Sequence, residues 1–177
     1  MSQPPLRVFT VGHSTRSAAE FLGLLTAHHI AQLADVRTIP RSRRHPHFSG
    51  DTLAVQLRQH GIDYRHFPAL GGLRHPRPDS PNTAWKNASF RGYADHMMTP
   101  EFAGALDDLL TFGSVAPTAI MCAEAVWWRC HRALLADALA MRSVAVLHIE
   151  SAGPARPHRV TEFARNLEGK PVYPGLV

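Results

Sequence analysis

The chain has 177 residues, 45% of them hydrophobic and 19% charged, and a formal net charge of +5. These proportions are typical of one globular domain, so we predict a single domain over residues 1–177, and the positive charge favours acidic partners without requiring nucleic acid. No apolar run reaches the roughly 18 residues of a membrane span, and the first residues lack the apolar centre of a secretion signal, which predicts a cytoplasmic protein with no membrane partner.

The N-terminal region predicts a strand, a helix and a second strand. Leu6–Val11 is a short β-rich apolar run that stops at a polar turn. Ser17–Glu20 has the spacing of a capping box, so a helix follows. Ile30–Val36 reads as the next strand, and the three elements together are typical of a right-handed unit with parallel strands.

A basic loop separates this unit from the next helix and strand. Residues 38–48 carry three arginines, two histidines and two prolines, which predicts an exposed loop. Ser49 then caps a short helix that ends at Gly61, and Ile62–Phe67 is the third strand. Residues 68–98 contain two adjacent glycines and little periodicity, so we expect a long loop excursion that ends in a short helix.

The second half continues the alternation of helices and strands. Thr99 and Pro100 begin a helix that ends at Gly113. Residues 117–122 and 144–149 read as the fourth and fifth strands, with a helix between them that opens at Cys130 or His131. From about residue 151 we expect a tail with a short terminal helix and an extended end. The order of elements predicts a three-layer α/β fold of the Rossmann-like or flavodoxin-like kind, with a mostly parallel five-stranded sheet.

Reactive side chains follow three of the predicted strands. In an open parallel sheet, ligands bind beyond the carboxyl ends of the strands. We therefore expect one site there, with the following candidates: catalytic Cys122, Glu124, His131 and His13, and substrate-binding Ser14, Arg37, Arg41, Arg91, Tyr93 and Arg132.

Cys122 is the predicted nucleophile, because a following helix N-terminus and nearby basic groups would stabilise a thiolate. His131 or His13 would carry the proton, and Glu124 would orient that histidine or accept from it. The alternative for Cys122 is a small buried core residue. Arg37 and Arg41 would hold a phosphate or carboxylate through paired donors, and the alternative for Arg37 is a buried salt bridge to Asp35 or Glu124.

Zinc is an alternative reading of the same residues. Cys122, Cys130, His131 and His13 offer ligands for a tetrahedral site, although adjacent Cys130 and His131 would point in different directions on a helix. The cofactor is otherwise unknown from sequence. Loss of Cys130 would unfold a zinc-supported domain.

Several motifs resemble a known bacterial family. Val-Gly-His-Ser-Thr at 11–15, Asp-Val-Arg-Thr-Ile-Pro-Arg-Ser at 35–42, Leu-Gly-Gly at 70–72, and Cys-Ala-Glu at 122–124 followed by Cys-His-Arg at 130–132 stand in this order. Together they resemble the family called domain of unknown function 488. Phe-Arg-Gly-Tyr-Ala-Asp at 90–95 is similar to a further block of it. The resemblance implies a fold and a residue set, but no reaction.

We expect an enzyme that acts on a phosphate-bearing substrate, a nucleotide or nucleic acid, through a Cys/His/Arg site. The alternative from another class is a non-catalytic nucleic-acid-binding module, in which residues 41–47 and Trp85 contact the polymer. The oligomeric state and any protein partner do not follow from the sequence.

Overall fold

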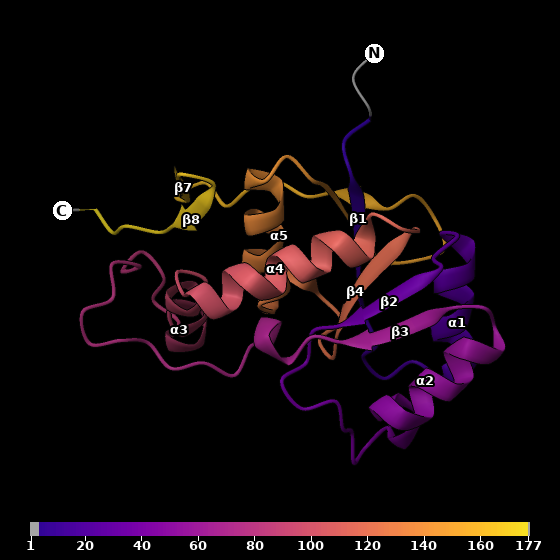
Figure 1. Cartoon of the computed structure of the whole chain (residues 1–177). Coiled ribbons are helices and arrows are strands. Elements are labelled where there is room, and N and C mark those ends of the chain that lie inside the picture. The colour runs from indigo at the N-terminus through magenta and orange to yellow at the C-terminus, as the bar shows by residue number, and fades with distance from the viewer. Residues whose placement is uncertain (1–3, 177) are drawn as a thin grey trace.

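The protein is built around one mostly parallel sheet. A computed structural model describes residues 4–176 and shows the sheet order β3-β2-β4-β1-β5-β6 (Figure 1). The strands are β1 (Arg7–Gly12), β2 (Gln32–Asp35), β3 (Asp63–His66), β4 (Thr118–Cys122), β5 (Ala145–Ile149) and β6 (Arg156–Pro157). β1 to β5 are mutually parallel, and β6 joins β5 antiparallel. The five predicted strands are confirmed, and β6 adds a sixth.

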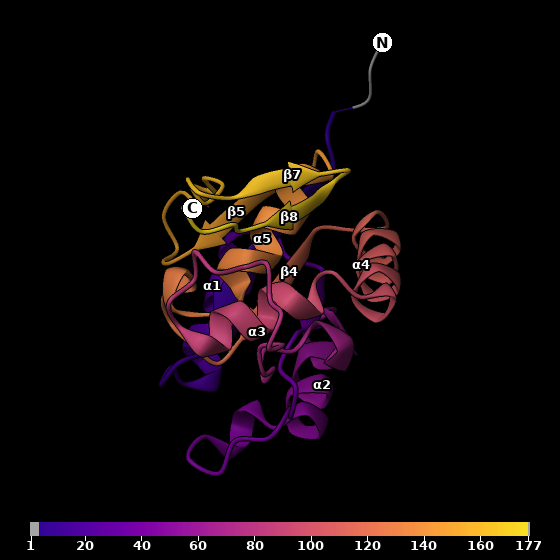
Figure 2. The ribbon, with the colours of Figure 1, turned by 90° about the vertical axis from the view of Figure 1, so that its left-hand side faces the viewer.

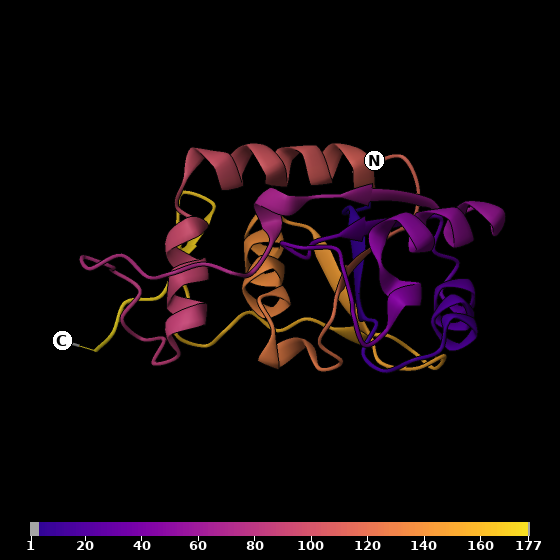
Figure 3. The same cartoon turned by 90° about the horizontal axis from the view of Figure 1, so that it is seen from below.

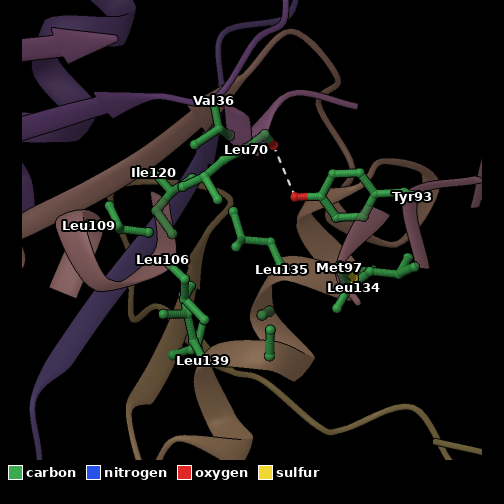
Figure 4. Close-up of a cluster of buried hydrophobic side chains, with 14 of the residues drawn as sticks. Val36, Leu70, Tyr93, Met97, Leu106, Leu109, Ile120, Leu134, Leu135 and Leu139 are labelled. Carbon is green, nitrogen blue, oxygen red and sulfur yellow. Dashed lines mark hydrogen bonds between the residues drawn. The ribbon is translucent and has the colours of Figure 1, made fainter. Parts of the chain in front are cut away.

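Helices cover both faces of the sheet, as predicted for a three-layer α/β fold (Figure 3). The helices are α1 (Ala18–Ala27), α2 (Gly50–Gln59), α3 (Ala88–His96), α4 (Pro100–Gly113) and α5 (Arg132–Met141). Phe21 of α1 and Leu57 of α2 belong to one apolar cluster, whereas Leu106 of α4 and Leu135 of α5 belong to the other (Figure 4). No helix of the described residues is long and apolar enough to cross a membrane.

The helix boundaries follow the local sequence signals. Ser17 and Glu20 form the predicted capping box of α1, with both reciprocal hydrogen bonds present. The Thr99 side chain accepts from the backbone N–H of Phe102 and begins α4. Gly61 follows α2 with a φ of 72°, a conformation that glycine adopts without steric cost. Ser49 occupies the N-cap position of α2, but its side chain makes no capping hydrogen bond.

The strand order opens a crevice between β1 and β4. β4 lies between β1 and β2, whereas the first two strands are neighbours in Rossmann and flavodoxin sheets. The chain leaves β1 towards α1 on one face and leaves β4 towards α5 on the other. Connections that diverge in this way leave space beyond the carboxyl ends of two central strands, where ligands bind in open α/β sheets.

The C-terminal tail is extended, so the predicted short terminal helix is wrong. After β6 the tail forms a hairpin of β7 (Arg165–Leu167) and β8 (Lys170–Val172) beside α5 (Figure 2). Glu168 and Gly169 at its turn both have positive φ, which suits a tight two-residue turn. Tyr173 then buries its ring fully and donates its hydroxyl to Asp137 of α5 at 2.8 Å. This burial of an aromatic anchor decides the path of the tail.

The long excursion at 68–98 is held together by the buried carboxylate of Asp95 and is tied to the tail through Asn82. Asp95 accepts hydrogen bonds from the backbone N–H of Arg77, from the Ser80 hydroxyl and from the Asn82 amide. The Asn82 carbonyl oxygen in turn accepts from the backbone N–H of Tyr173 at 2.9 Å. The excursion is therefore a folded part of the domain.

Gly12 allows the end of β1 to pass under the loop that follows β4. A Cβ at this position would overlap the backbone carbonyl of Glu124 and crowd Ala125. The same crossing is held by hydrogen bonds from the N–H groups of His13 and Ser14 to the carbonyls of Cys122 and Ala123, both at 3.0 Å. The close approach places both polar strand ends at one point.

We predict that Gly12→Ala lowers the free energy of unfolding by about 2 kcal/mol or more, because backbone rather than a flexible side chain must move. Urea unfolding followed by circular dichroism measures this. Gly23→Ala is the matched control: nothing lies within 4 Å of its added Cβ on α1, so it should raise stability by roughly 0.5–1 kcal/mol. Equal stability of the two variants would contradict the crossing.

Candidate active site

A cavity of about 400 Å³ opens at the carboxyl ends of β1, β2 and β4. The loop after β2, the Gly72 segment and the loop between β4 and α5 complete its walls. The lining residues on which the site depends are His13, Arg37, Arg41, Cys122, Glu124, Arg129, Cys130 and His131. A shallower groove of about 580 Å³ shares His13, Arg41 and Glu124 with it and continues over Ser14. The structure thus brings together most of the predicted residues.

Two cysteine thiols lie at the base of the cavity. Cys122 ends β4, Cys130 precedes α5, and their sulfur atoms are 2.7 Å apart in a hydrogen bond. The bond donated by Cys122 lowers the pKa of Cys130 well below its usual value. Burial and the neighbouring Cys130 raise the pKa of Cys122. Cys130 is therefore the more acidic thiol of the pair and a better candidate nucleophile than the predicted Cys122.

His131 is placed to take the proton of Cys130. Its Nε2–H donates to the carbonyl of Val36 at 2.9 Å, so Nδ1 of the neutral ring is free to accept. That Nδ1 lies 3.4 Å from the Cys130 sulfur. Transfer of the thiol proton to Nδ1 produces an imidazolium beside the thiolate, the arrangement that activates cysteine nucleophiles.

Gly72 makes room for the imidazole ring. A Cβ at Gly72 would press on Nδ1 and Cγ of His131. On another side the ring packs against Tyr93, with centroids 5.1 Å apart. The Leu-Gly-Gly motif therefore has a structural cause, because a side chain at its last position would displace the histidine.

Arg132 holds the loop that carries both cysteines. Its guanidinium is 1% exposed and donates to the backbone carbonyls of Glu124 at 2.6 Å and Ala125 at 3.2 Å. No carboxylate of the described residues forms an ion pair with it. Its charge also lowers the pKa of Cys130. Arg132 thus positions the loop and stabilises the thiolate, which corrects its prediction as a substrate contact.

Arg37 is fixed by Asp35 in the buried salt bridge that the sequence left as an alternative. Nε and Nη2 of Arg37 donate to the two Asp35 oxygens at 2.9 and 2.6 Å, and the Tyr64 hydroxyl also donates to Asp35. Nη1 lies 3.5 Å from Nε2 of His13. Arg37 lines the cavity all the same, so a held guanidinium faces the ligand space.

His13 supports Arg37 as a neutral acceptor. Its Nδ1–H donates to the carbonyl of Ser14 at 2.9 Å, which leaves Nε2 as the acceptor facing Arg37. Burial lowers the pKa of His13 to about 4, and the Arg37 charge adds to this effect. The ring also stacks on Phe48, with centroids 4.3 Å apart. His13 is uncharged at neutral pH and its Nε2 faces the Arg37 guanidinium, so His131 is the better placed of the two predicted proton carriers.

Ser14 joins β1 to the wall of the adjacent groove. It has a φ of 49°, a conformation that is uncommon for a residue with a side chain. Its backbone accepts from the His13 ring and donates to the Ala123 carbonyl. The predicted binding residue therefore lines the groove while its backbone orients His13.

The mouth of the cavity combines positive charge with apolar surface. Exposed Arg41 and Arg129 stand on opposite loops, and the exposed side chains of Ile39 and Leu73 also line the opening. Glu124 is exposed at the mouth, where its carboxylate accepts from the N–H of Ala125 at 3.1 Å. Val36, not Glu124, orients His131, which corrects that predicted role.

Three further residues that were predicted to contact substrate or nucleic acid make contacts within the protein. Tyr93 is 0% exposed and donates its hydroxyl to the Leu70 carbonyl at 2.9 Å (Figure 4). Arg91 donates through Nε and Nη2 to the carbonyl of Trp85. The Trp85 ring packs edge-on against Phe90 and Phe163 and lines neither cavity. Tyr93 is therefore buried away from the predicted substrate contact, and Arg91 and Trp85 lie outside both cavities.

The geometry does not support the zinc alternative. Within residues 4–176, no three His, Cys, Asp or Glu side chains are grouped so that they could hold one metal ion. Nε2 of His131 is bonded to Val36, and Nε2 of His13 faces the Arg37 guanidinium. A metal cation bound to His13 would be repelled by the Arg37 guanidinium. Cys122, Cys130, His131 and His13 therefore do not form one set of metal ligands.

A buried relay behind the site is absent from the predicted set. Thr10, His148, His158 and Asp137 are linked in series by hydrogen bonds of 2.6, 2.9 and 2.7 Å. Arg132 donates to the Thr10 end at 3.3 Å. These residues come from three strands or loops and α5, so no local spacing in the sequence could reveal them. Arg129 is also absent from the predicted set, although it directly precedes Cys130.

The comparison with family models identifies the chain. The model described as "Domain of unknown function DUF488" matches residues 17–139, which include both cysteines. The chain belongs to this family. Neither characterised proteins nor solved structures show a match to it. Membership in the DUF488 family confirms the resemblance seen in the motifs and leaves the function to be argued from the site.

We predict that stability falls as the pH drops from about 6.5 to 4, because the unfolded chain then binds protons that buried His13 rejects in the folded state. Burial also lowers the pKa of His148, to about 3, which acts in the same direction. His13→Asn should reduce this loss by about 2 kcal/mol. Urea unfolding at a series of pH values measures it.

The control is His75→Asn, at an exposed position outside both cavities. This variant should retain the wild-type pH dependence. An unchanged slope in His13→Asn would contradict the neutral, buried state of His13.

Proposed function

We propose that the protein is a thiol-dependent enzyme that acts on a small phosphate-bearing substrate such as a nucleotide. The observation that carries the proposal is the Cys130 sulfur beside Nδ1 of His131 in a cavity lined by arginines. Cys130 is the nucleophile, and His131 accepts its proton and returns it to the leaving group. Arg132 and Cys122 stabilise the thiolate from the protein side.

The charge distribution favours an anionic substrate. Arg37, Arg41 and Arg129 line the cavity, and a guanidinium binds phosphate through two parallel donors. Arg37 keeps its orientation because Asp35 holds two of its nitrogens. Asp35 compensates only this one arginine, so Arg41 and Arg129 keep their charge available for a ligand.

The apolar side of the mouth suits the other end of a nucleotide. Ile39 and Leu73 expose their side chains beside the arginines, and Phe90 lines the same cavity. A planar base would cover this surface while its phosphate contacts the guanidinium groups. The volume of about 400 Å³ is in the range of small-molecule pockets.

A nucleic-acid ligand is the second candidate, because the adjacent groove adds Arg43 and Arg44 to the positive surface. A binding module of this kind would show affinity that falls steeply with salt and would not need Cys130. Oligonucleotides therefore form a separate arm of the binding experiments below.

We predict that iodoacetamide alkylates Cys130 rapidly at pH 6.5, where an ordinary thiol is protonated. His131→Gln keeps a donor for Val36 but removes the proton acceptor, so alkylation should slow by about tenfold or more. Intact mass and peptide mapping measure the rate at each cysteine. If Cys122 reacts first, or if His131→Gln reacts like the wild type, the proposed nucleophile is wrong.

We predict that AMP or ADP binds at low salt and protects Cys130 from iodoacetamide. Arg41→Ala and Arg129→Ala should each weaken binding by roughly tenfold, because each removes a charge-assisted hydrogen bond. Calorimetric titration gives the affinities, and Arg58→Ala is the control because this exposed arginine of α2 lines neither cavity. Folded wild-type protein that binds no phosphate, nucleotide or oligonucleotide would refute the anion site.

A further inference from the structure

Simple nucleophilic catalysis needs a hydrogen-bond donor at position 122 but does not need a second sulfur atom. Cys122 stabilises the Cys130 thiolate by donating a hydrogen bond, and a serine hydroxyl would donate equally well. Yet a sulfur is present, 2.7 Å from the nucleophile and brought there by a different element of the fold. Two thiols in contact, one of them ionised, are the components of a dithiol–disulfide exchange centre.

The two thiols differ in acidity, as disulfide exchange requires of an attacking thiol and a second, resolving thiol. Cys130 lies beside His131 with a lowered pKa and is the attacking group. Cys122 is 2% exposed, and burial together with the Cys130 thiolate raises its pKa. Once Cys130 is bonded to a substrate sulfur it is no longer an anion, and this cause of the raised Cys122 pKa disappears. Cys122 is then easier to ionise at the moment when its attack is needed.

We propose that the Cys122–Cys130 pair reduces low-molecular-weight disulfides that carry acidic groups. This inference rests on the proposed function, because the substrate would occupy the same arginine-lined cavity. Phosphate and carboxylate substituents share the chemistry that Arg41 and Arg129 recognise.

The exchange is balanced in two displacements. The Cys130 thiolate attacks one substrate sulfur, a bond forms between these two sulfurs, and the first substrate thiolate leaves with the proton held by His131. The Cys122 thiol then loses its proton and attacks the Cys130 sulfur. A Cys122–Cys130 disulfide forms as the second substrate thiolate leaves, and the proton from Cys122 passes to this thiolate through solvent. Two electrons move from the cysteines to the substrate, and an external dithiol returns the pair to the reduced state.

The loop geometry allows the sulfurs to join without unfolding. Both cysteines sit at the ends of the loop held by Arg132, whose guanidinium bonds the Glu124 and Ala125 carbonyls and not the sulfur atoms. A bond of about 2.05 Å replaces the present contact of the two sulfurs. The Arg132 guanidinium can therefore keep its hydrogen bonds to the two carbonyls in both redox states.

The experiment uses fully reduced protein and three disulfide probes. Oxidised coenzyme A carries phosphates, oxidised glutathione carries carboxylates, and cystamine is a cationic comparison. Intact mass should show the loss of two hydrogen atoms from the wild type with release of two thiols, and the reaction should be at least about tenfold faster with the acidic probes. A preference for oxidised coenzyme A over oxidised glutathione would assign phosphate as the recognised group.

The cysteine variants identify the steps. Cys122→Ser keeps a hydrogen-bond donor but removes the second sulfur, so Cys130 should react once and stop at a mixed disulfide, visible as an added substrate half. Cys130→Ser should form neither product. Circular dichroism checks that both variants are folded, and alkylation of Cys130 in Cys122→Ser serves as an internal check on the site.

The outcomes separate this inference from the proposed function. If nucleotides protect Cys130 from iodoacetamide but no disulfide probe oxidises the pair, the exchange activity is overturned and the proposed function stands. If cystamine reacts as fast as the acidic probes and nucleotides give no protection, the acidic substrate is overturned together with the anion site. A mixed disulfide that persists in the wild type would overturn the role of Cys122.

Discussion

The site depends on the crossing of β1 by the loop that follows β4. Gly12 has no side chain, so the Glu124 carbonyl can pass close to the end of β1, and Arg132 secures the loop by bonding to two of its carbonyls. A buried guanidinium with no carboxylate partner among the described residues is costly unless another charge compensates it. The Arg132 charge also lowers the pKa of Cys130, so the residue that fixes the loop favours the ionised form of this thiol.

Charge around the cavity is arranged in two layers with different roles. Asp35 neutralises Arg37 and orients it, and His13 accepts from the same guanidinium while remaining uncharged. The exposed arginines at the mouth have no such partner in the cavity lining except the rim carboxylate of Glu124. The inner layer provides rigidity and the outer layer provides attraction for anions, which together suit a pocket for an acidic ligand.

The C-terminal half of the domain supports the site from behind. The relay from Thr10 through His148 and His158 to Asp137 joins β1 and β5 to α5, and Arg132 touches its Thr10 end. Trp127 stacks on His148 with parallel rings 4.1 Å apart, which ties the loop between β4 and α5 to this relay. The cysteine loop is thus restrained on the sheet side and the helix side, as a preorganised site requires.

The sequence by itself determined the five helices from α1 to α5 and five strands, because caps, apolar runs and turn residues act over a few positions, as Ser17, Thr99 and Gly61 show. It also placed Cys122, Cys130 and His131 at one strand-to-helix connection. The tertiary structure alone decided the insertion of β4 between β1 and β2, the anchoring of the tail by Tyr173, and the burial of Tyr93 and Arg132. It also set the opposite directions of the two cysteine pKa shifts, which depend on burial, on Arg132 and on His131. His131 is held in turn by the carbonyl of Val36, and such contacts between residues distant along the chain are not encoded in local spacing.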